Sequence, residues 1–370
     1  MHIQFVLAGL HRVRRGAEVA FESIAEQLAL NREDTVTLIG SGEPRAGQPY
    51  RFAQVPLIAR ERFEKWPTGP FFRNDMMYEE FTFAARLLLS RASRDADITV
   101  TCGYPYTNWA LRARGGVTTK PLHVFVTQNG DWPAYQRKSE YRYFSCDGLV
   151  CTNPLYYERN RERWTSLLVP NGIDPARFYP GTVDRAALGL PAGGPIVLMV
   201  CAAQASKRVI EGLRAVARVP GAICVVAGDG PMRNEIEQLG AELMPGRFQR
   251  RSFPHHQMGD LYRSANVLLH PTIGESFGNI YVEALACGLP VVAHDEEVTR
   301  WIYDGRAFLV DAKSEQAMVD GLNAALNAPS AVLLENASYA GQRFAWSAIA
   351  KQYRAFFAEL LARRNGLQTS

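Results

Sequence analysis

Two glutamates stand out in the stretch GESFGNIYVEALACG, which covers residues 274–288. Seven residues separate Glu275 from Glu283. The stretch follows the strand-like run VLLHP, and we expect a helix that begins near Gly278 and ends at Gly288. The free N–H groups and positive dipole end of such a helix start suit a diphosphate, and a glycine there lets a ligand approach the backbone. Glu275 precedes the helix and Glu283 lies on its second turn, so both carboxylates can line one pocket.

Further candidates follow two other strand-like runs. Lys207 lies in VCAAQASKRV, where the neighbouring Arg208 either supplies a second cation or lies in water at a helix end. Gly228 and Gly230 form a Gly-x-Gly-Pro turn in AGDGPMRNEIEQL. This turn does not meet the GxGxxG pattern that is typical of dinucleotide-binding proteins.

The first half of the chain offers weaker candidates. Arg15 and Gly16 lie in the loop LHRVRRGAE after the first strand-like run, where an arginine either binds a phosphate or is an ordinary surface residue. Asn129 and Asp131 follow the run HVFVT, at the expected carboxyl end of a strand. An amide at this place can hydrogen-bond a hydroxyl group but cannot carry a proton at pH 7.

Short apolar runs alternate with segments of helical period along the whole chain. The apolar runs have the length of strands, and in helical segments such as residues 18–30 the apolar side chains recur on one face. Strands that alternate with helices indicate parallel sheets in an α/β fold. The expected strands cover residues 3–9, 36–40, 98–103, 123–127, 148–152, 196–203, 222–228, 247–253, 267–270, 290–293 and 308–310.

The length of 370 residues predicts two domains, because one hydrophobic core rarely supports so many. Residues 170–194 are rich in Pro and Gly, lack a sustained period and separate the two series of strands. We therefore predict one doubly wound domain over residues 1–170 and a second over residues 171–345. Residues 346–370 contain a long amphipathic helix, which we expect to cross back to the first domain. Two such domains would leave a cleft that faces the carboxyl ends of both sheets.

The composition is that of an ordinary globular protein, with 47% hydrophobic and 21% charged residues. No apolar run approaches the roughly 18 residues that span a bilayer, and the start MHIQFVLAG has no leader-like features, so we expect a cytoplasmic location. The net charge of +4 is too small and too scattered for nucleic-acid binding. The six cysteines include no CxxC pair, which indicates reduced thiols. His255 and His256 have no companions at metal-ligand spacing, so we expect no metal site. We expect no other cofactor either.

Together these motifs resemble the retaining nucleotide-sugar transferases of glycosyltransferase family 4. The resemblance runs the length of the chain and is strongest from Asn171 onward, where NGIDPARFYP is similar to the family's segment at the entrance to the second domain. It implies the GT-B architecture, with two Rossmann-like domains that face a central cleft, and activity without a metal. It also implies a nucleotide-diphosphate sugar as donor and a hydroxyl acceptor, which is a glycan, a lipid-linked molecule or a small molecule.

The resemblance assigns roles to the motifs. Glu275 would meet the donor sugar near its reacting face, Glu283 would hydrogen-bond the ribose hydroxyls, and Lys207 would bind the diphosphate. The chain departs from the family at Ala202, where the family has an arginine, and after the fourth strand, where Asn129 or Asp131 would replace a sugar-facing histidine. The other residues implied in donor binding are Arg15, Gly16, Arg208, Gly228, Gly230, Phe253, Pro254, Ser276, Phe277, Gly278, Asn279 and Ile280.

A retaining transfer proceeds either through a covalent glycosyl-enzyme or by front-face substitution, in which the leaving phosphate takes the acceptor's proton. The resemblance favours the second route, with the diphosphate held by Lys207 and the amides of Gly278 and Asn279. Closure of the domains would then expel water.

Three alternatives stay open at this point. A GT-B nucleotide-sugar epimerase is disfavoured by the lack of an evident histidine base. A dinucleotide oxidoreductase is disfavoured by the lack of GxGxxG. A non-catalytic sugar-nucleotide-binding protein is compatible with the missing arginine and histidine.

The excess of positive charge lies within residues 1–170, which carry 22 Lys and Arg against 18 Asp and Glu. Residues 78–94 are expected to form an apolar helix with Arg86, Arg91 and Arg94 near its end. Such a helix either packs on its own sheet or lies on the anionic inner face of a membrane, with the arginines at the headgroups. The second arrangement predicts peripheral membrane contact and a lipid-linked acceptor.

Overall fold

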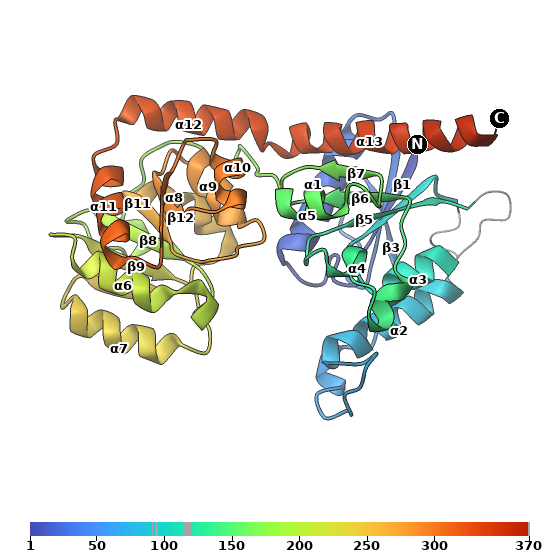
Figure 1. Ribbon diagram of the computed structural model, residues 1–370, viewed down its shortest axis with the longest axis horizontal. Helices are drawn as coiled ribbons and strands as arrows, with labels where there is room; N and C mark the ends of the chain where they lie inside the picture. The colour runs from blue at the N-terminus through green and yellow to red at the C-terminus, as the bar shows by residue number, and fades with distance from the viewer. Residues whose placement is uncertain (91, 93–94, 114–119, 369–370) are drawn as a thin grey trace. The chain divides into compact units, whose positions relative to one another are not determined.

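The computed structural model describes residues 1–90, 92, 95–113 and 120–368. The chain folds into two compact units. Unit 1 comprises Met1–Asn171 and the C-terminal helix that begins at Trp346, and unit 2 comprises Gly172–Ala345. In each unit, helices cover a central parallel sheet (Figure 1), as the crossover connections between parallel strands require.

The sheet of unit 1 has seven strands within the described residues, in the order β3-β2-β1-β4-β5-β6-β7, and all neighbouring strands are parallel. The chain builds outward from β1 to one edge and then returns to build the other, as in a doubly wound sheet. The strands are β1 (His2–Val6), β2 (Thr35–Gly40), β3 (Arg51–Gln54), β4 (Ile98–Thr101), β5 (Leu122–Val126), β6 (Gly148–Cys151) and β7 (Ser166–Leu168).

Helices and short 3-10 turns (η) connect these strands. They are α1 (Gly16–Leu30), η1 (Arg60–Arg62), α2 (Asp75–Leu89), α3 (Tyr106–Ala113), α4 (Trp132–Tyr135), η2 (Ser139–Tyr143), α5 (Pro154–Asn160) and α13 (Trp346–Gln368). The long helix α13 packs against α1. Its residues Tyr353, Phe356 and Phe357 are buried in the same core as Phe5 of β1, so the end of the chain completes the core of unit 1.

The sheet of unit 2 has six strands within the described residues, in the order β10-β9-β8-β11-β12-β13, and all its neighbouring strands are also parallel. The apolar runs of β8 and β9 are buried almost throughout, which is typical of parallel strands covered on both faces. The strands are β8 (Ile196–Val200), β9 (Ile223–Ala227), β10 (Phe248–Arg251), β11 (Val267–His270), β12 (Val291–His294) and β13 (Phe308–Val310).

The connections of unit 2 are helical as well. They are η3 (Ala186–Leu188), η4 (Ala205–Lys207), α6 (Val209–Ala217), α7 (Arg233–Leu243), η5 (His255–Gln257), α8 (Met258–Ser264), α9 (Asn279–Ala286), α10 (Glu297–Tyr303), α11 (Glu315–Leu326) and α12 (Ser330–Arg343). The α/β class and the doubly wound parallel sheets predicted from the sequence are thus confirmed.

Among the described residues, two strands were not predicted by the sequence analysis. β3 and β7 are the two edge strands of unit 1. Each is short, and their residues are partly exposed rather than buried. A short edge strand needs apolar contact on fewer sides, so its sequence lacks the apolar run that marks a central strand.

The helix expected over residues 78–94 is α2, which begins at Asp75 and ends at Leu89. Asn74 caps its start, since its side chain accepts a hydrogen bond from the Met77 N–H at 3.1 Å. Arg91 and Arg94 lie outside the described residues. Within the part of the chain that is described, no helix combines the length and the apolar character needed to cross a membrane.

Candidate functional site

Glu275 lies at the centre of a polar cluster in unit 2. Its Oε2 atom is 2.6 Å from Lys207 Nζ and 3.3 Å from His270 Nε2. His270 ends β11, and Lys207 ends η4, the turn that follows β8. Because β8 and β11 are neighbours in the sheet, their carboxyl ends bring these side chains together although 68 residues separate Lys207 from Glu275.

The ionisation of this cluster follows from its contacts. Burial by itself would raise the pKa of Glu275, but hydrogen bonds from His270 and Lys207, together with the lysine's charge, lower this pKa to about 2. Burial lowers the pKa of His270 in spite of the neighbouring carboxylate. At pH 7 Glu275 is therefore a carboxylate held between an ammonium group and a neutral imidazole. Such a carboxylate accepts hydrogen bonds from hydroxyl groups and has no proton to donate.

The backbone at the start of α9 adopts a conformation that requires glycine. Gly278 precedes the helix with a φ of 76°, in the left-handed region. A Cβ atom at this position would lie 2.8 Å from ring atoms of Tyr281. Among the described residues no side chain caps this helix start, and an uncapped N-terminus suits an anion.

Glu296 holds the loop before α9, although the sequence analysis did not select it. Its carboxylate accepts hydrogen bonds from the N–H groups of Gly274 at 2.9 Å and Glu275 at 3.2 Å. Glu296 comes shortly after β12, and β12 is the neighbour of β11. Glu296 could have been selected from the sequence, because it is a polar residue just beyond the carboxyl end of a neighbouring strand. His270 offered the same signal and was also missed.

Glu283 has different surroundings from Glu275. It lies on the second turn of α9, where its Oε2 accepts a hydrogen bond of 2.8 Å from the Tyr262 hydroxyl. Burial raises the pKa of Glu283, and the hydrogen bond from Tyr262 opposes this effect. The first glutamate of the motif is thus held ionised by a cation, whereas the second is fixed by a neutral hydroxyl.

Gly228 and Gly230 position the site through close backbone packing. A Cβ on Gly228 would lie 1.8 Å from the carbonyl oxygen of Cys201, and one on Gly230 would lie 2.6 Å from that of Ala203. The Ala203 N–H in turn donates to the Asp229 carbonyl at 2.9 Å. The loop after β9 therefore supports the loop after β8, which leads to Lys207.

Ala202 and Arg208 are the two positions at which a second cation could accompany Lys207, and neither places a charge beside Glu275. Ala202 is exposed and carries no charge. The guanidinium of Arg208 lies 3.1 Å from the Glu211 carboxylate and donates to the Ala312 carbonyl at 3.1 Å. Arg208 therefore contacts α6 and the segment after β13, and the structure does not bring it to Glu275.

The remaining predicted residues of unit 2 lie at the same edge of the sheet. Phe253 and Pro254 follow the carboxyl end of β10, and the Arg251 guanidinium lies 5.4 Å from the centre of the Phe253 ring. Ser276 and Asn279 lie on either side of Gly278. Phe277 is buried in the core and can meet a ligand only through its backbone, whereas Ile280 is partly buried and packs against the same core.

In unit 1 the structure separates two candidates that the sequence left equivalent. Asn129 is exposed, with its amide nitrogen 4.0 Å from Cys102 Sγ. Asp131 is buried, and its carboxylate accepts a hydrogen bond of 2.8 Å from Asn160 and lies 3.5 Å from Arg159. Burial raises the pKa of Asp131, and these partners oppose the rise. The placement of Asp131 argues against a sugar-facing role and leaves Asn129 as the candidate.

The loop before α1 keeps its predicted position at the carboxyl end of β1. Arg15 is the exposed residue before the helix, and Gly16 is the first helical residue.

Glu18 of α1 and Glu80 of α2 lie near Cys102, and burial raises the pKa of both carboxyl groups. Among the described residues, no three or more His, Cys, Asp or Glu side chains are grouped to hold a metal ion.

The sequence of unit 2 matches a known family. Residues 182–344 match the family described as "Glycosyl transferases group 1". This segment lies within unit 2 and contains Lys207, Glu275 and Glu283.

Solved structures resemble the whole chain. Sucrose-phosphate synthase from Thermosynechococcus elongatus has a TM-score of 0.75 and 21% sequence identity, with 98% of this chain and 99% of that chain covered. HepE from Anabaena, solved in complex with UDP and glucose, has a TM-score of 0.71 and 15% identity, with 97% and 100% covered. The fold is GT-B.

Curated relatives match part of this GT-B chain. The D-inositol 3-phosphate glycosyltransferase of Mycolicibacterium smegmatis is 33% identical over 237 residues, which are 57% of this chain and 54% of the relative. The enzyme of that name from Mycobacterium tuberculosis is 38% identical over 138 residues, or 34% of this chain and 28% of the relative. The chain thus spans about half or less of the length of these relatives.

Proposed function

We propose that this GT-B protein transfers a glycosyl group, with retention of configuration, from a nucleotide-diphosphate sugar to a hydroxyl acceptor. The observation that carries the proposal is the Lys207–Glu275 pair beside the start of α9. A diphosphate needs a cation and N–H donors, which Lys207 and the helix start can supply. A sugar needs acceptors for its hydroxyl groups, which the ionised Glu275 supplies. The match of residues 182–344 to the group 1 transferases supports this reading.

The donor that deserves the first test is UDP-glucose. HepE was solved in complex with UDP-glucose, and a trehalose-6-phosphate protein from E. coli, with a TM-score of 0.72, was solved with UDP-2-fluoro glucose. In this chain, Glu283 would accept hydrogen bonds from the ribose hydroxyls. Phe253 and Pro254 would lie beside the base, where backbone groups can recognise it.

The proposed reaction is a front-face substitution without a metal. The bond between the anomeric carbon and the diphosphate oxygen breaks, and the acceptor oxygen bonds to the same face of that carbon. The departing phosphate oxygen takes the proton of the acceptor hydroxyl, so no side chain has to shuttle it. Lys207 and the amides of Gly278 and Asn279 would stabilise the charge that develops on the diphosphate.

The surroundings of Glu275 favour this route over a covalent intermediate. Lys207 and His270 both contact Oε2 of Glu275 and stabilise the negative charge of the carboxylate. A carboxylate whose pKa is lowered to about 2 is also a weaker nucleophile than an ordinary one. Glu275 is therefore better suited to hold sugar hydroxyls than to attack the sugar.

The proposal is tested by incubating the purified protein with labelled UDP- and GDP-sugars and measuring the release of free nucleoside diphosphate. Release that requires an added hydroxyl acceptor, with the α-configuration of the donor retained in the product, is the expected result. An inverted product would contradict the retaining mechanism. Tight binding of a nucleotide sugar without any turnover would favour the non-catalytic alternative.

We also propose that α2 brings unit 1 to an anionic membrane, where a lipid-linked acceptor would lie. Four large apolar side chains on α2 are exposed: Met76 by 47%, Phe81 by 45%, Leu88 by 42% and Leu89 by 82%. Arg86 is exposed in the last turn of the same helix. Apolar side chains that reach the acyl boundary beside a cation that meets the headgroups are typical of interfacial helices.

Co-sedimentation with vesicles of phosphatidylglycerol and phosphatidylcholine tests this contact. The wild type should bind at low salt, and a variant with Phe81, Leu88 and Leu89 changed to Ser should not. The matched control changes the exposed Val332 and Leu334 of α12 to Ser. Equal binding by the wild type and the α2 variant, or no binding by either, would contradict membrane contact through α2. A water-soluble acceptor would then be the remaining proposal.

A further inference from the structure

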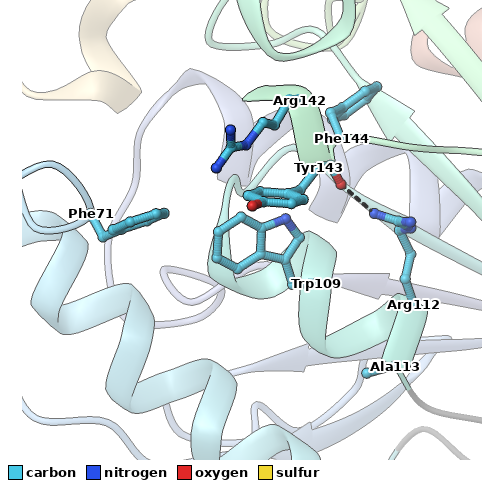
Figure 2. A pocket seen from close by; sticks show the side chains of 7 residues that line it. All are labelled: Phe71, Trp109, Arg112, Ala113, Arg142, Tyr143 and Phe144. Carbon is cyan, nitrogen blue, oxygen red and sulfur yellow. Dashed lines mark hydrogen bonds between the residues drawn. The ribbon is translucent and has the colours of Figure 1, made fainter. Parts of the chain in front are cut away.

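A pocket of about 790 Å³ lies in unit 1, beside α3 and η2. Figure 2 shows its walls: Trp109 and Tyr143 lie against each other, and Phe71 reaches in from the opposite side. Arg112, Ala113, Arg142 and Phe144 form the rest of the lining. None of these residues belongs to the proposed transfer site.

The aromatic side chains of the pocket contact one another and remain open to solvent. The rings of Trp109 and Tyr143 meet edge to face, with centroids 6.1 Å apart, and Phe71 lies 6.3 Å from Trp109. Phe71 is nevertheless 41% exposed and Tyr143 is 50% exposed. Exposed aromatic faces gain stability when a ligand with apolar surface covers them. A sugar ring has such a surface, formed by its C–H groups, and carries hydroxyls around its edge.

The polar part of the lining is cationic. Arg112 donates a hydrogen bond of 2.7 Å to the Tyr143 carbonyl, which fixes its guanidinium and leaves other N–H groups for a ligand. The Arg142 guanidinium lies 4.8 Å from the centre of the Tyr143 ring. In the part of the chain that is described, Arg142 has no carboxylate partner.

The nearest acid of this segment is already engaged. Glu140, in the same turn η2 as Arg142, is buried and forms an ion pair with Arg73. No carboxylate lines the pocket among the described residues. The positive charge of two arginines is therefore available to a ligand, and guanidinium groups bind phosphate and carboxylate through paired hydrogen bonds.

We propose that this pocket binds a soluble saccharide that carries an anionic group. The sugar ring stacks on the exposed aromatic surface of Phe71 and Tyr143, and the anionic group lies against Arg112 and Arg142. The volume accommodates a ligand of this size, since small-molecule pockets commonly measure about 300–1,000 Å³. Binding here involves unit 1 alone and does not depend on the transfer reaction.

Isothermal calorimetry with glucose 6-phosphate, glucose and inorganic phosphate tests the proposal on the full chain. Glucose 6-phosphate should bind more tightly than either of the other two. Arg142→Gln should weaken the binding of glucose 6-phosphate by about tenfold or more, since one charge-assisted contact is lost. Tyr143→Ser should weaken it as well, because it removes part of the stacking surface.

Two matched substitutions serve as controls. Arg51→Gln changes an exposed arginine at the start of the edge strand β3, and Tyr179→Ser changes a tyrosine of similar exposure in unit 2. Both should leave the affinity unchanged. The proposal is overturned if glucose 6-phosphate does not bind, or if Arg142→Gln binds it like the wild type. Equal affinity for inorganic phosphate would refute stacking, and equal affinity for glucose would refute the anionic requirement.

Discussion

Lys207 carries three N–H donors, and one of them is directed to Glu275 at 2.6 Å. The others can meet a diphosphate while the ion pair persists. In the proposed reaction, the pair would place a cation for the leaving group and a carboxylate for the sugar on the segments that follow two adjacent strands of one sheet. Because each charge stabilises the other, a change at either residue also alters its partner.

Glu275→Gln should lower turnover by on the order of 100-fold while nucleotide affinity changes little, because the contact with the sugar strengthens in the transition state. Glu283→Ala should instead weaken donor binding by about tenfold, since ribose hydrogen bonds are equal in ground and transition states. Steady-state kinetics and UDP titrations measure both effects. Glu283→Gln is the control that keeps an acceptor for the Tyr262 hydroxyl. Wild-type turnover in Glu275→Gln would refute its assignment.

Lys207→Ala should cost about 1.5–3 kcal/mol of diphosphate interaction, the usual range for a hydrogen bond to a charged group. The affinity for UDP, measured by calorimetry, should fall accordingly. Lys351→Ala, an exposed lysine of α13, is the matched control and should bind as the wild type does. The same reasoning predicts full activity in EDTA. Activity that disappears in EDTA and returns with Mg²⁺ or Mn²⁺ would contradict the role given to Lys207.

His123 makes the stability of unit 1 depend on pH. Its side chain is buried between Thr99 and Asn108, and burial lowers the pKa of His123 to about 3. As pH falls from about 6.5 towards 3, the unfolded chain takes up a proton that the folded chain does not. His123 should therefore lower the free energy of unfolding by about 1.4 kcal/mol for each pH unit below about 6.5. Above pH 6.5 its contribution to stability is fully retained.

Urea unfolding of the wild type and His123→Gln at pH 7, 6 and 5 isolates this contribution. The difference between the two proteins should shrink as the pH falls, because the variant lacks the histidine. A constant difference between wild type and His123→Gln at all three pH values would show that His123 is not responsible.

At the scale of elements, the loops after β8 and β9 act as one supporting structure. Gly228→Ala would place a Cβ 1.8 Å from the Cys201 carbonyl oxygen. Backbone cannot move aside as a flexible side chain does, so we expect a loss of about 1–3 kcal/mol of stability. Gly193→Ala, where no atom lies within 4 Å of the added Cβ, is the control. Thermal unfolding should show a lower melting temperature only for Gly228→Ala, and equal melting temperatures would contradict the packing argument.

At the scale of the whole molecule, the last helix of the chain belongs to the first unit. Phe357 of α13 is fully buried in the core of unit 1. Phe357→Ala should therefore destabilise unit 1 by about 3–5 kcal/mol and leave unit 2 unaffected. Hydrogen exchange read separately on β1 and β8 measures the two units. Leu334→Ala, an exposed site on α12, should change neither unit. Equal loss of protection in β1 and β8 would show that the units unfold together.

The alternation of buried strands with helices could be predicted from the sequence because it depends on local patterns. An apolar run such as residues 196–200 and the one-sided helix over residues 16–30 each encode their element within a few turns. The left-handed Gly278 and the Gly228 turn are equally local, since glycine marks conformations that other residues avoid. The short edge strand β3 could not be predicted from such patterns, because an edge strand needs no continuous apolar run.

Which polar side chains meet was decided by the tertiary structure alone. The sequence shows Lys207, Glu275 and His270 as isolated residues at strand ends, and only the adjacency of β8 and β11 brings them together. The same holds for Asp131, whose carboxylate meets Asn160 from 29 residues away and is thereby withdrawn from the surface. Periodicity is set by neighbours along the chain, whereas hydrogen-bond partners are set by the order of strands in a sheet, and no local pattern records that order.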